Sequence, residues 1–282
     1  MAEAAAPHEL TARRKGAPLP RRWQAELSAV AVIAHRDFVK LLRDRLRLLS
    51  ELAFPLVLVL LLGPALQSGF GAPGGLSLTA FVFSGVLAQT IWQSAVLGLV
   101  SLVADREEDF SQEIFVSPAS RYSIVAGKII GESLVALPTG LGIVVVGLLI
   151  GVPLPLPVLV ALVPTSLFVA LNGGAFGLLL LSRVGSQRAA NQIFPFLLLP
   201  QYFLAGVFNP IHGLRLPLAV LSALSPLRYA VELTRNAIYG LQPGVPAPET
   251  AAAPINAAVL GASLLAFLVA GTFLFVRAER NR

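Results

Sequence analysis

Acidic and apolar side chains that could form a docking surface gather in one segment, ADREEDFSQEIFVSPASRYSIVAG, at residues 104–127. Five carboxylates crowd its first half: Asp105, Glu107, Glu108, Asp109 and Glu113. Phe110 and Ile114 stand four residues apart, so on a helix they would share one face. We expect a short helix with an acidic rim and two apolar side chains that insert into a soluble partner. The alternative is a solvated loop between membrane spans, whose carboxylates oppose the dipole of a neighbouring helix.

Other kinds of site chemistry find little support in the sequence. The absence of cysteine excludes disulfides, thiolate metal sites and a cysteine nucleophile. His8, His35 and His212 lie too far apart in sequence for metal-ligand spacing. Gly127 and Lys128 do not form a phosphate-binding loop, because the upstream Gly and the following Ser or Thr are missing. We expect no catalytic residue, no metal and no cofactor in this chain.

Glu132 is the one ionisable residue that the sequence places at depth in a span, a short way into the third. Intramembrane carboxylates are candidate functional residues, so one alternative is a proton-coupled carrier that depends on Glu132. Lys128 lies four residues earlier and could pair with it on the same helix face, which favours a structural role. The remaining economical hypothesis is that a separate protein supplies the energy.

The composition is that of an integral membrane protein. Hydrophobic residues make up 56% of the 282 residues, charged residues 13%, and the mean hydropathy is +0.77. Soluble domains carry roughly 25% charged residues. The net charge of +6 would fit a nucleic-acid-binding protein, but the basic residues cluster beside membrane spans. We therefore expect no nucleic acid partner.

The first 49 residues are expected to lie outside the membrane core. Residues 1–20 are rich in Ala and Pro and predict a disordered cytoplasmic tail. Residues 23–49 have helical periodicity, with an apolar stripe and a basic stripe. Trp23 is an aromatic residue near the start of this segment. The basic stripe consists of Arg36, Lys40, Arg43 and Arg47. We expect an interfacial amphipathic helix in contact with lipid headgroups.

Six apolar segments are candidates to cross a bilayer, for which about 20 apolar residues are needed as a helix. They lie at residues 50–66, 78–103, 124–150, 158–181, 191–208 and 256–276. Gly173 and Gly177 in the fourth segment have the spacing that permits close helix approach. The predicted fold is an all-α membrane protein with six transmembrane helices.

Residues 216–239, before the last span, contain two shorter apolar segments separated by Pro226. Each is too short to cross the membrane, so we expect two short re-entrant external helices that dip into the outer leaflet. The alternative is a seventh span bent at Pro226, which would place the C-terminus outside.

The distribution of basic residues predicts the orientation. With a cytoplasmic N-terminus, 18 of the 21 Lys and Arg lie on the cytoplasmic side, and only Arg215, Arg228 and Arg235 lie outside. We expect a multi-pass protein of the plasma (inner) membrane with both termini in the cytoplasm.

Three segments carry a resemblance to a known family. They are residues 106–128, with REE, EIFVSPASR and GK; residues 203–229, with FLAGVFNP, LP and LSPLRY; and residues 42–55, with LRDR leading to Pro55. Together with the order of six spans, these segments resemble the type-2 ATP-binding-cassette (ABC-2) permeases, and among them the daunorubicin-resistance type. The resemblance extends from residue 21 to residue 282.

The resemblance implies partners and a coupling element. Two permease copies would pair as a homodimer, each seated on a separate ATPase subunit that holds ATP and Mg²⁺. Residues 105–115 would form the coupling helix. Its charged residues would be Asp105, Glu107, Glu108 and Glu113, and its apolar residues Phe110 and Ile114. The helix at residues 23–49 would also touch the ATPase.

The resemblance also implies a path and a cargo. The second and fifth spans would line the path, with polar contacts from Gln89, Gln93, Asn191 and Gln201. The external gate would include Pro217, Pro226 and Tyr229. The expected function is export of a lipophilic or amphipathic drug or lipid. The alternatives are export of a lipid-linked glycan or polysaccharide, and a non-transporting membrane anchor or assembly factor.

Overall fold

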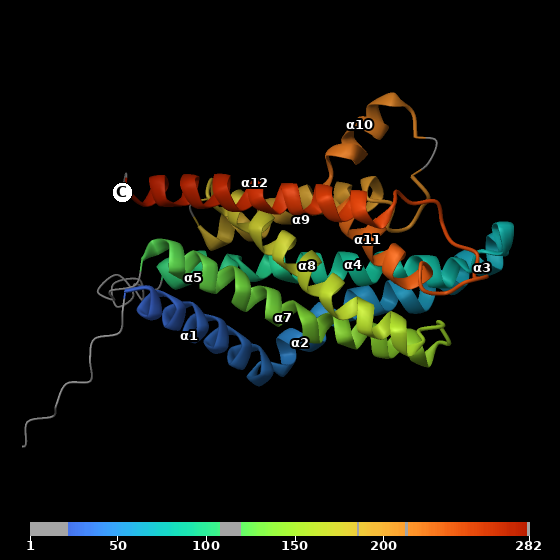
Figure 1. Ribbon diagram of the computed structural model, residues 1–282, viewed down its shortest axis with the longest axis horizontal. Helices are drawn as coiled ribbons and strands as arrows, with labels where there is room; N and C mark the ends of the chain where they lie inside the picture. Colours follow the sequence, from blue (N-terminus) through green and yellow to red (C-terminus); the bar gives the residue numbers. More distant parts are fainter. Residues whose placement is uncertain (1–21, 108–119, 185, 212–213, 281–282) are drawn as a thin grey trace, which may run out of the picture.

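The computed structural model describes residues 22–107, 120–184, 186–211 and 214–280, which form a bundle of helices without strands (Figure 1). The helices are α1 (Arg22–Arg43), α2 (Arg45–Val57), the π-helix η1 (Leu58–Leu62), α3 (Gly63–Phe70), the short 3₁₀-helix η2 (Pro73–Gly75), α4 (Leu78–Gly98), α5 (Val100–Glu107), α7 (Arg121–Leu149), α8 (Leu156–Leu181), α9 (Gln187–Leu204), α10 (Leu216–Leu224), α11 (Pro226–Tyr239) and α12 (Ala253–Arg280). The predicted all-α fold is confirmed. The disordered tail predicted at residues 1–20 lies outside the described residues.

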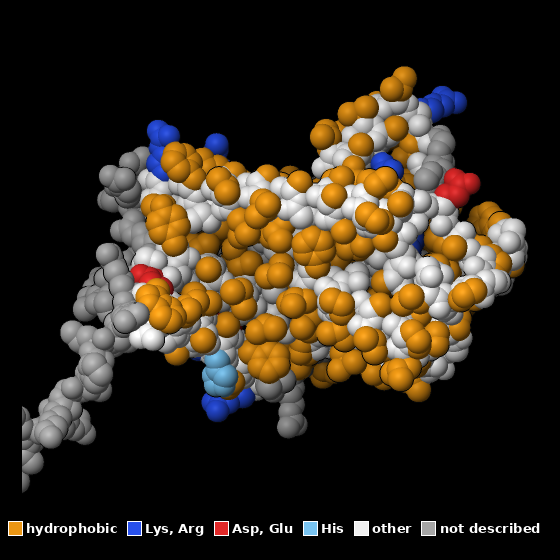
Figure 2. Space-filling model, in the orientation of Figure 1, with side chains coloured by type: hydrophobic (Ala, Val, Ile, Leu, Met, Phe, Trp, Pro, Cys, Tyr) orange, Lys and Arg blue, Asp and Glu red, His pale blue; other side chains and the backbone are white. Residues whose placement is uncertain are grey.

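Within the described ranges, five helical segments are long and apolar enough to cross a bilayer: Leu46–Phe70, Leu78–Val103, Tyr122–Leu149, Leu156–Leu181 and Ala253–Arg277. The helices α10 and α11 pass the same test only as a pair, and the pair is bent by 78°. On the face shown in Figure 2, hydrophobic side chains spread over the bundle while Lys and Arg lie mostly near its margins. These features confirm a multi-pass membrane protein.

The helix α9 overlaps the fifth predicted span but is not among those five segments. It runs over Gln187–Leu204 instead of residues 191–208, and its 18 residues include two interior prolines. Arg188, Asn191 and Gln201 add polar side chains that lower its hydropathy. Its exposed side chains nevertheless include Ile193, Phe196, Leu199 and Phe203.

The helix predicted at residues 23–49 is divided at Asp44. This residue has φ −96° and ψ 78°, and its carboxylate accepts a hydrogen bond from the Arg47 backbone N–H at 3.0 Å, which caps α2. The first apolar span therefore begins at Leu46 rather than at residue 50. Pro55 lies inside α2, and a π-helical turn follows at Leu58–Leu62. A proline removes one helical hydrogen bond and commonly accompanies such distortions.

The helix α1 packs along the first half of α7 because two glycines of α7 face it. A Cβ on Gly127 would lie 3.2 Å from the Val30 Cα, and one on Gly131 would lie 3.1 Å from the Ala34 Cα. The two contacts advance in the same direction along both helices, so α1 and α7 run parallel here. This packing brings Asp37 of α1 beside the polar residues of α7.

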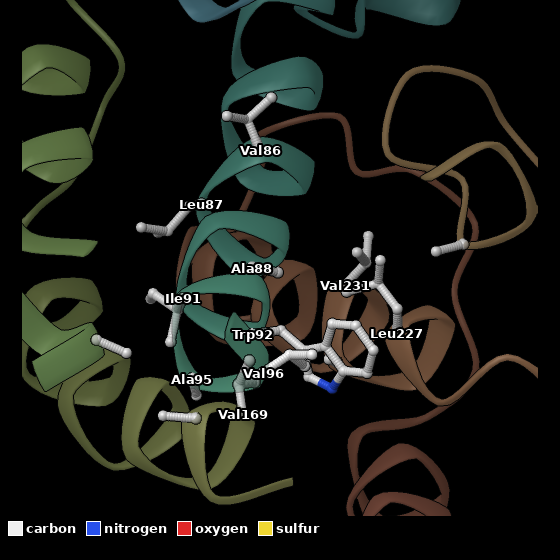
Figure 3. Close-up of a cluster of buried hydrophobic side chains, with 14 of the residues drawn as sticks. Val86, Leu87, Ala88, Ile91, Trp92, Ala95, Val96, Val169, Leu227 and Val231 are labelled. Carbon is white, nitrogen blue, oxygen red and sulfur yellow. The ribbon is translucent and has the colours of Figure 1, made fainter. Parts of the chain in front are cut away.

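The centre of the bundle is α4, which packs against α7, α8 and α11. Its buried side chains, Trp92 among them, pack with Val169 of α8 and with Leu227 and Val231 of α11 in the apolar cluster of Figure 3. A Cβ on Gly173 would collide with the Trp92 carbonyl, and one on Gly177 would lie 2.8 Å from the Val96 carbonyl oxygen. The close approach predicted from this glycine pair is confirmed, and its partner is α4. The Trp92 indole N–H also donates to Asn172 Oδ1 at 3.0 Å.

Candidate functional site

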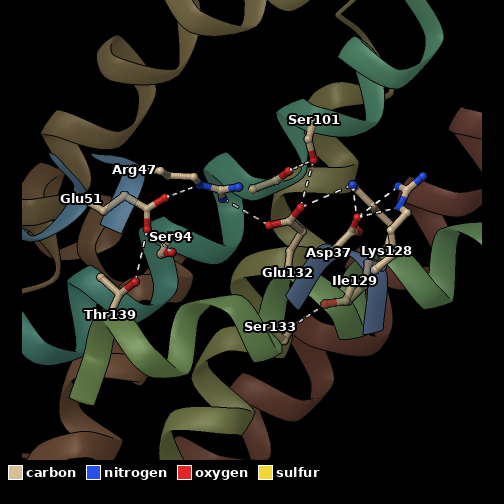
Figure 4. A network of polar contacts seen from close by, with 12 residues as sticks. Asp37, Arg47, Glu51, Ser94, Ser101, Lys128, Ile129, Glu132, Ser133 and Thr139 are labelled. Atoms are coloured by element: carbon tan, nitrogen blue, oxygen red, sulfur yellow. Dashed lines mark hydrogen bonds and ion pairs between the residues drawn. The ribbon is translucent and has the colours of Figure 1, made fainter. Parts of the chain in front are cut away.

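A buried network of ion pairs joins α1 to α7. Lys128 Nζ lies 2.9 Å from Asp37 Oδ2 and 3.4 Å from Glu132 Oε1 (Figure 4). Each of these three residues is at most 4% exposed. Arg36 reaches Asp37 from the same helix, at 3.1 Å. The ion pair between Lys128 and Glu132 that their spacing predicts is confirmed.

The network continues into α2 through Arg47. Its guanidinium lies 3.4 Å from Glu132 Oε2 and 2.8 Å from Glu51 Oε1. The other oxygen of Glu51 accepts hydrogen bonds from Ser94 of α4 at 2.9 Å and from Thr139 of α7 at 3.3 Å. Four helices, α1, α2, α4 and α7, are thus linked by one set of polar contacts.

Among the described residues, the charges in this network balance. Three bases (Arg36, Arg47 and Lys128) face three carboxylates (Asp37, Glu51 and Glu132). An unpaired charge in such a place would be costly, whereas a paired and hydrogen-bonded one is tolerated. Ser101 adds a hydrogen bond to Glu132 Oε1 at 3.0 Å. Because Glu132 has two basic partners, its surroundings favour a structural role over the proton-carrier alternative.

The expectation that Glu132 would be the one ionisable residue at depth is wrong. Glu51 lies inside the Leu46–Phe70 segment, and Lys128, Glu232 and Arg235 are almost fully buried. A signal for most of them was present in the sequence, because base and acid stand four residues apart in three of the ion pairs. The pairs are Arg47 with Glu51, Lys128 with Glu132, and Arg228 with Glu232. Such spacing places both charges on one helix face.

A cavity of about 230 Å³ opens beside Glu51, between α2, α4 and α7. Its lining combines polar side chains with a few apolar ones: Ser50, Glu51, Phe54, Pro55, Thr90, Gln93, Ser94, Leu97 and Thr139. Thr90 is 4% exposed, and its hydroxyl finds no hydrogen-bond partner among the described residues. The bundle therefore holds a polar cavity within its membrane-spanning helices, with one hydrogen-bonding group unused.

The four residues predicted to line the path do not form one cluster. Gln89 donates to Gln93 Oε1 at 3.1 Å, and the Tyr202 hydroxyl of α9 donates to the same oxygen. Gln201 is half-buried next to Tyr202. Asn191 is exposed ten residues earlier on α9, which corresponds to about 15 Å along the helix. The structure adds Tyr202, Glu51 and Thr90 to this region, none of which was singled out from the sequence.

The basic stripe predicted at residues 23–49 is divided between two environments. Trp23 is 56% exposed, and Lys40 and Arg43 are exposed as well, as an interfacial helix requires. Arg36 and Arg47 instead turn into the ionic network. For Arg47 the helical spacing alone could not show this, because a new helix begins after the break at Asp44.

The predicted coupling helix at residues 105–115 falls mostly outside the described residues. Asp105 and Glu107 belong to α5, whereas Glu108, Phe110, Glu113 and Ile114 lie outside the described ranges. The end of α5 and the start of α7 lie at the same end of the bundle as the C-terminus (Figure 1). Ser120, the N-cap of α7, donates its hydroxyl to Glu26 of α1 at 2.8 Å. The acidic segment is therefore joined at its C-terminal side to α1.

Two short helices, α10 and α11, occupy the place predicted for the external gate. Pro226 begins α11, and the Tyr229 hydroxyl donates to the Ala223 carbonyl at 2.9 Å across the bend. Pro217, near the start of α10, is exposed. Arg235 is buried with its guanidinium 3.8 Å from the centre of the Phe81 ring, which fastens α11 to α4.

Comparisons with known proteins agree with this architecture. Residues 28–239, which include the ionic network, the cavity and the bent helix pair, match the family described as ABC-2 type transporter. The chain is also 26% identical over 211 residues to the protein named "Putative transport permease ycf38" of Cyanophora paradoxa, an alignment that covers 72% of each chain. The family match spans well over half of the sequence, and the chain belongs to the ABC-2 type transporter family.

Proposed function

We propose that this chain is the transmembrane permease subunit of an ATP-powered exporter of lipophilic or amphipathic substrates. The observation that carries the proposal is the polar cavity inside the membrane-spanning helices, joined to α1 through Glu51, Arg47, Glu132, Lys128 and Asp37. Such a chain of contacts gives movement of α1 a physical route to the cavity. An ABC-2 permease works with an ATPase subunit, and this subunit would drive the movement of α1 that the contacts transmit to the cavity.

The ATPase would bind at the end of the bundle where α5 ends and α7 begins. The two helix ends that flank the acidic segment in sequence lie there, and this end faces the cytoplasm if the basic residues follow the positive-inside rule. ATP and Mg²⁺ would reside on two copies of that partner, and a second copy of this chain would complete a homodimeric path. The bent pair α10–α11 would form the external gate, in the plasma membrane.

The small volume of the cavity favours a lipophilic or amphipathic cargo over a lipid-linked glycan or polysaccharide. Its volume of about 230 Å³ is below the 300–1,000 Å³ typical of pockets that enclose a whole drug-sized ligand. It therefore fits a small polar headgroup, with the rest of the molecule among apolar side chains. A non-transporting anchor would not require such a cavity.

The decisive experiment is ATP-dependent transport in proteoliposomes that contain the permease and its co-purified ATPase. Replacing Phe110 and Ile114 together by Ala should abolish transport while ATP hydrolysis by the complex continues. Ser111→Ala, in the same segment, is the matched control and should transport normally. Unchanged transport in the double variant would rule out the coupling role. Transport that proceeds without any ATPase, or a permease that binds none, would overturn the proposed function.

A further inference from the structure

The cavity beside Glu51 has the hydrogen-bonding character of a site for a donor-rich ligand. The Glu51 carboxylate is 21% exposed in its wall, and Thr90, which also lines the cavity, has a buried hydroxyl with no hydrogen-bond partner among the described residues. Gln93 contributes a carbonyl oxygen that already accepts two hydrogen bonds. The hydroxyls of Ser94 and Thr139 donate their hydrogen bonds to Glu51, so their oxygens remain as acceptors for a ligand.

An ammonium group matches this set, because it offers three donors and no acceptor. Phe54 adds an aromatic ring to the same wall, and a cation held against an aromatic ring gains further electrostatic attraction. A phosphate or carboxylate would meet the Glu51 charge and several oxygens, which repel it. The lining thus selects for charge as well as for hydrogen-bond donors.

A cation bound in the cavity would share the Glu51 carboxylate with Arg47. Arg47 can allow this, since it already contacts Glu132 at 3.4 Å as well as Glu51, and its side chain is 31% exposed. When the ligand takes the Glu51 carboxylate, Arg47 retains Glu132 and solvent as partners.

The mouth of the cavity suits an apolar tail. Phe54 is 54% exposed and Leu97 is 37% exposed, and both lie at the cavity on helices that cross the membrane. A headgroup inside the cavity would leave the remainder of the ligand against these apolar surfaces and the lipid beyond. The shape therefore indicates an amphiphile.

We propose that this cavity binds the protonated amine headgroup of a lipophilic amine, with Glu51 and Thr90 as its principal ligands. The proposal deepens the proposed function by naming a substrate class, and the role in transport rests on that function. Binding itself does not depend on the ATPase.

The test measures binding of monodansylcadaverine, a fluorescent primary amine, to the purified permease in lipid nanodiscs, with empty nanodiscs subtracted. Its N-acetylated derivative, which is neutral, is the comparison ligand. We expect the amine to bind and the acetylated form to bind at least about tenfold more weakly, as expected for the loss of a charged hydrogen bond. Glu51→Gln should weaken amine binding about tenfold and bring the two ligands closer together.

Thr90→Val keeps the test decisive if Glu51→Gln fails to fold, because it removes one hydroxyl without disturbing the ion pairs. It should weaken amine binding about threefold to tenfold. The matched control is Thr165→Val on α8, whose hydroxyl donates to the Ala161 carbonyl in its own helix; amine binding should not change.

Equal binding of both ligands, or an unchanged affinity in Thr90→Val, would overturn the proposal. Displacement of the amine by excess NaCl but not by choline chloride would identify an inorganic cation site and would overturn it too. Because no ATPase is present, these results are separate from the transport experiment. Transport can be intact in a protein that does not bind the amine, and amine binding can be intact in a protein that does not transport.

Discussion

Lys128 is the residue on which the buried charges depend most. It holds two carboxylates, Asp37 and Glu132, and its side chain is 3% exposed. Lys128→Met should destabilise the protein by roughly 3–5 kcal/mol, because it removes the base that Asp37 and Glu132 share and leaves three carboxylates of the network facing two bases. The measurement is thermal unfolding of the detergent-solubilised protein, followed by loss of the monodisperse peak.

The double variant Lys128→Met/Asp37→Asn is the control for charge balance. It leaves Arg36 and Arg47 facing Glu51 and Glu132, so the network is neutral again, and the 28% exposed side chain of Arg36 can be hydrated. We expect it to recover a large part of the lost stability. A double variant no more stable than Lys128→Met would show that geometry, not neutrality, holds the site together.

Arg235 tests the attachment of the bent helix pair. Its guanidinium donates to the Gly206 carbonyl at 2.8 Å and to Ser84 Oγ at 3.3 Å while lying on the Phe81 ring. Arg235→Lys keeps the charge but cannot make both hydrogen bonds, because a lysine lacks the planar fork. We expect a loss of about 1–2 kcal/mol in thermal unfolding.

Arg228→Lys is the matched variant on the same helix. Its side chain is 24% exposed and pairs with Glu232 within α11, so the expected loss is below about 1 kcal/mol. If Arg235→Lys and Arg228→Lys lower the stability in thermal unfolding by the same amount, the buried contacts of Arg235 do not specifically hold α11 in position.

At the scale of helices, the contact between α8 and α4 depends on the absence of a side chain. A Cβ on Gly177 would meet the Val96 carbonyl oxygen at 2.8 Å, and backbone cannot move aside as a flexible side chain can. Gly177→Ala should therefore cost about 1–3 kcal/mol, measured by thermal unfolding. At Gly261 a Cβ would meet only the tip of Phe168, at 3.5 Å. Gly261→Ala should be neutral or slightly stabilising, by up to about 1 kcal/mol, and equal losses at both sites would contradict this interpretation.

The positions of the helices were largely predictable, since they follow from local patterns. The fourth span was expected at residues 158–181 and is found at Leu156–Leu181, because an apolar run there ends at Arg183. The spacing of Gly173 and Gly177 predicted a close helix contact, but the sequence did not identify α4 as the partner helix. Hydropathy and residue spacing are local properties of the sequence, so they predict where a helix lies without knowledge of its tertiary contacts.

The ionic network was not predictable as a whole, because it joins residues far apart in sequence. Asp37 and Lys128 are 91 positions apart and meet only because Gly127 and Gly131 let α1 approach α7. Arg47 looked like part of an exposed stripe until the cap at Asp44 started a new helix. Pairs four residues apart could be read from the sequence, whereas links between helices required the packing.

At the scale of the molecule, the arrangement of the two ends determines how the protein could work. The end of α5, the start of α7 and the C-terminus lie at one end, while α12 begins beside α11 and the loop between α11 and α12 extends toward α3 at the other end (Figure 1). The acidic segment and the loop between α11 and α12 should therefore face opposite sides of the membrane. An ATPase that docks on the acidic segment would act from the side opposite the bent pair α10–α11.

The chain contains no cysteine, so single cysteines can report this arrangement without background. Ser111→Cys in the acidic segment should react with a membrane-impermeant maleimide in inside-out vesicles and not in intact cells. Ala247→Cys, an exposed position in the loop before α12, should show the opposite pattern, because 18 of the 21 Lys and Arg favour a cytoplasmic location for the first end. The unsubstituted chain is the control and should not react. Labelling of both positions from the same side would contradict the helix arrangement, and a reversed pattern would place the acidic segment outside, where no cytoplasmic ATPase could reach it.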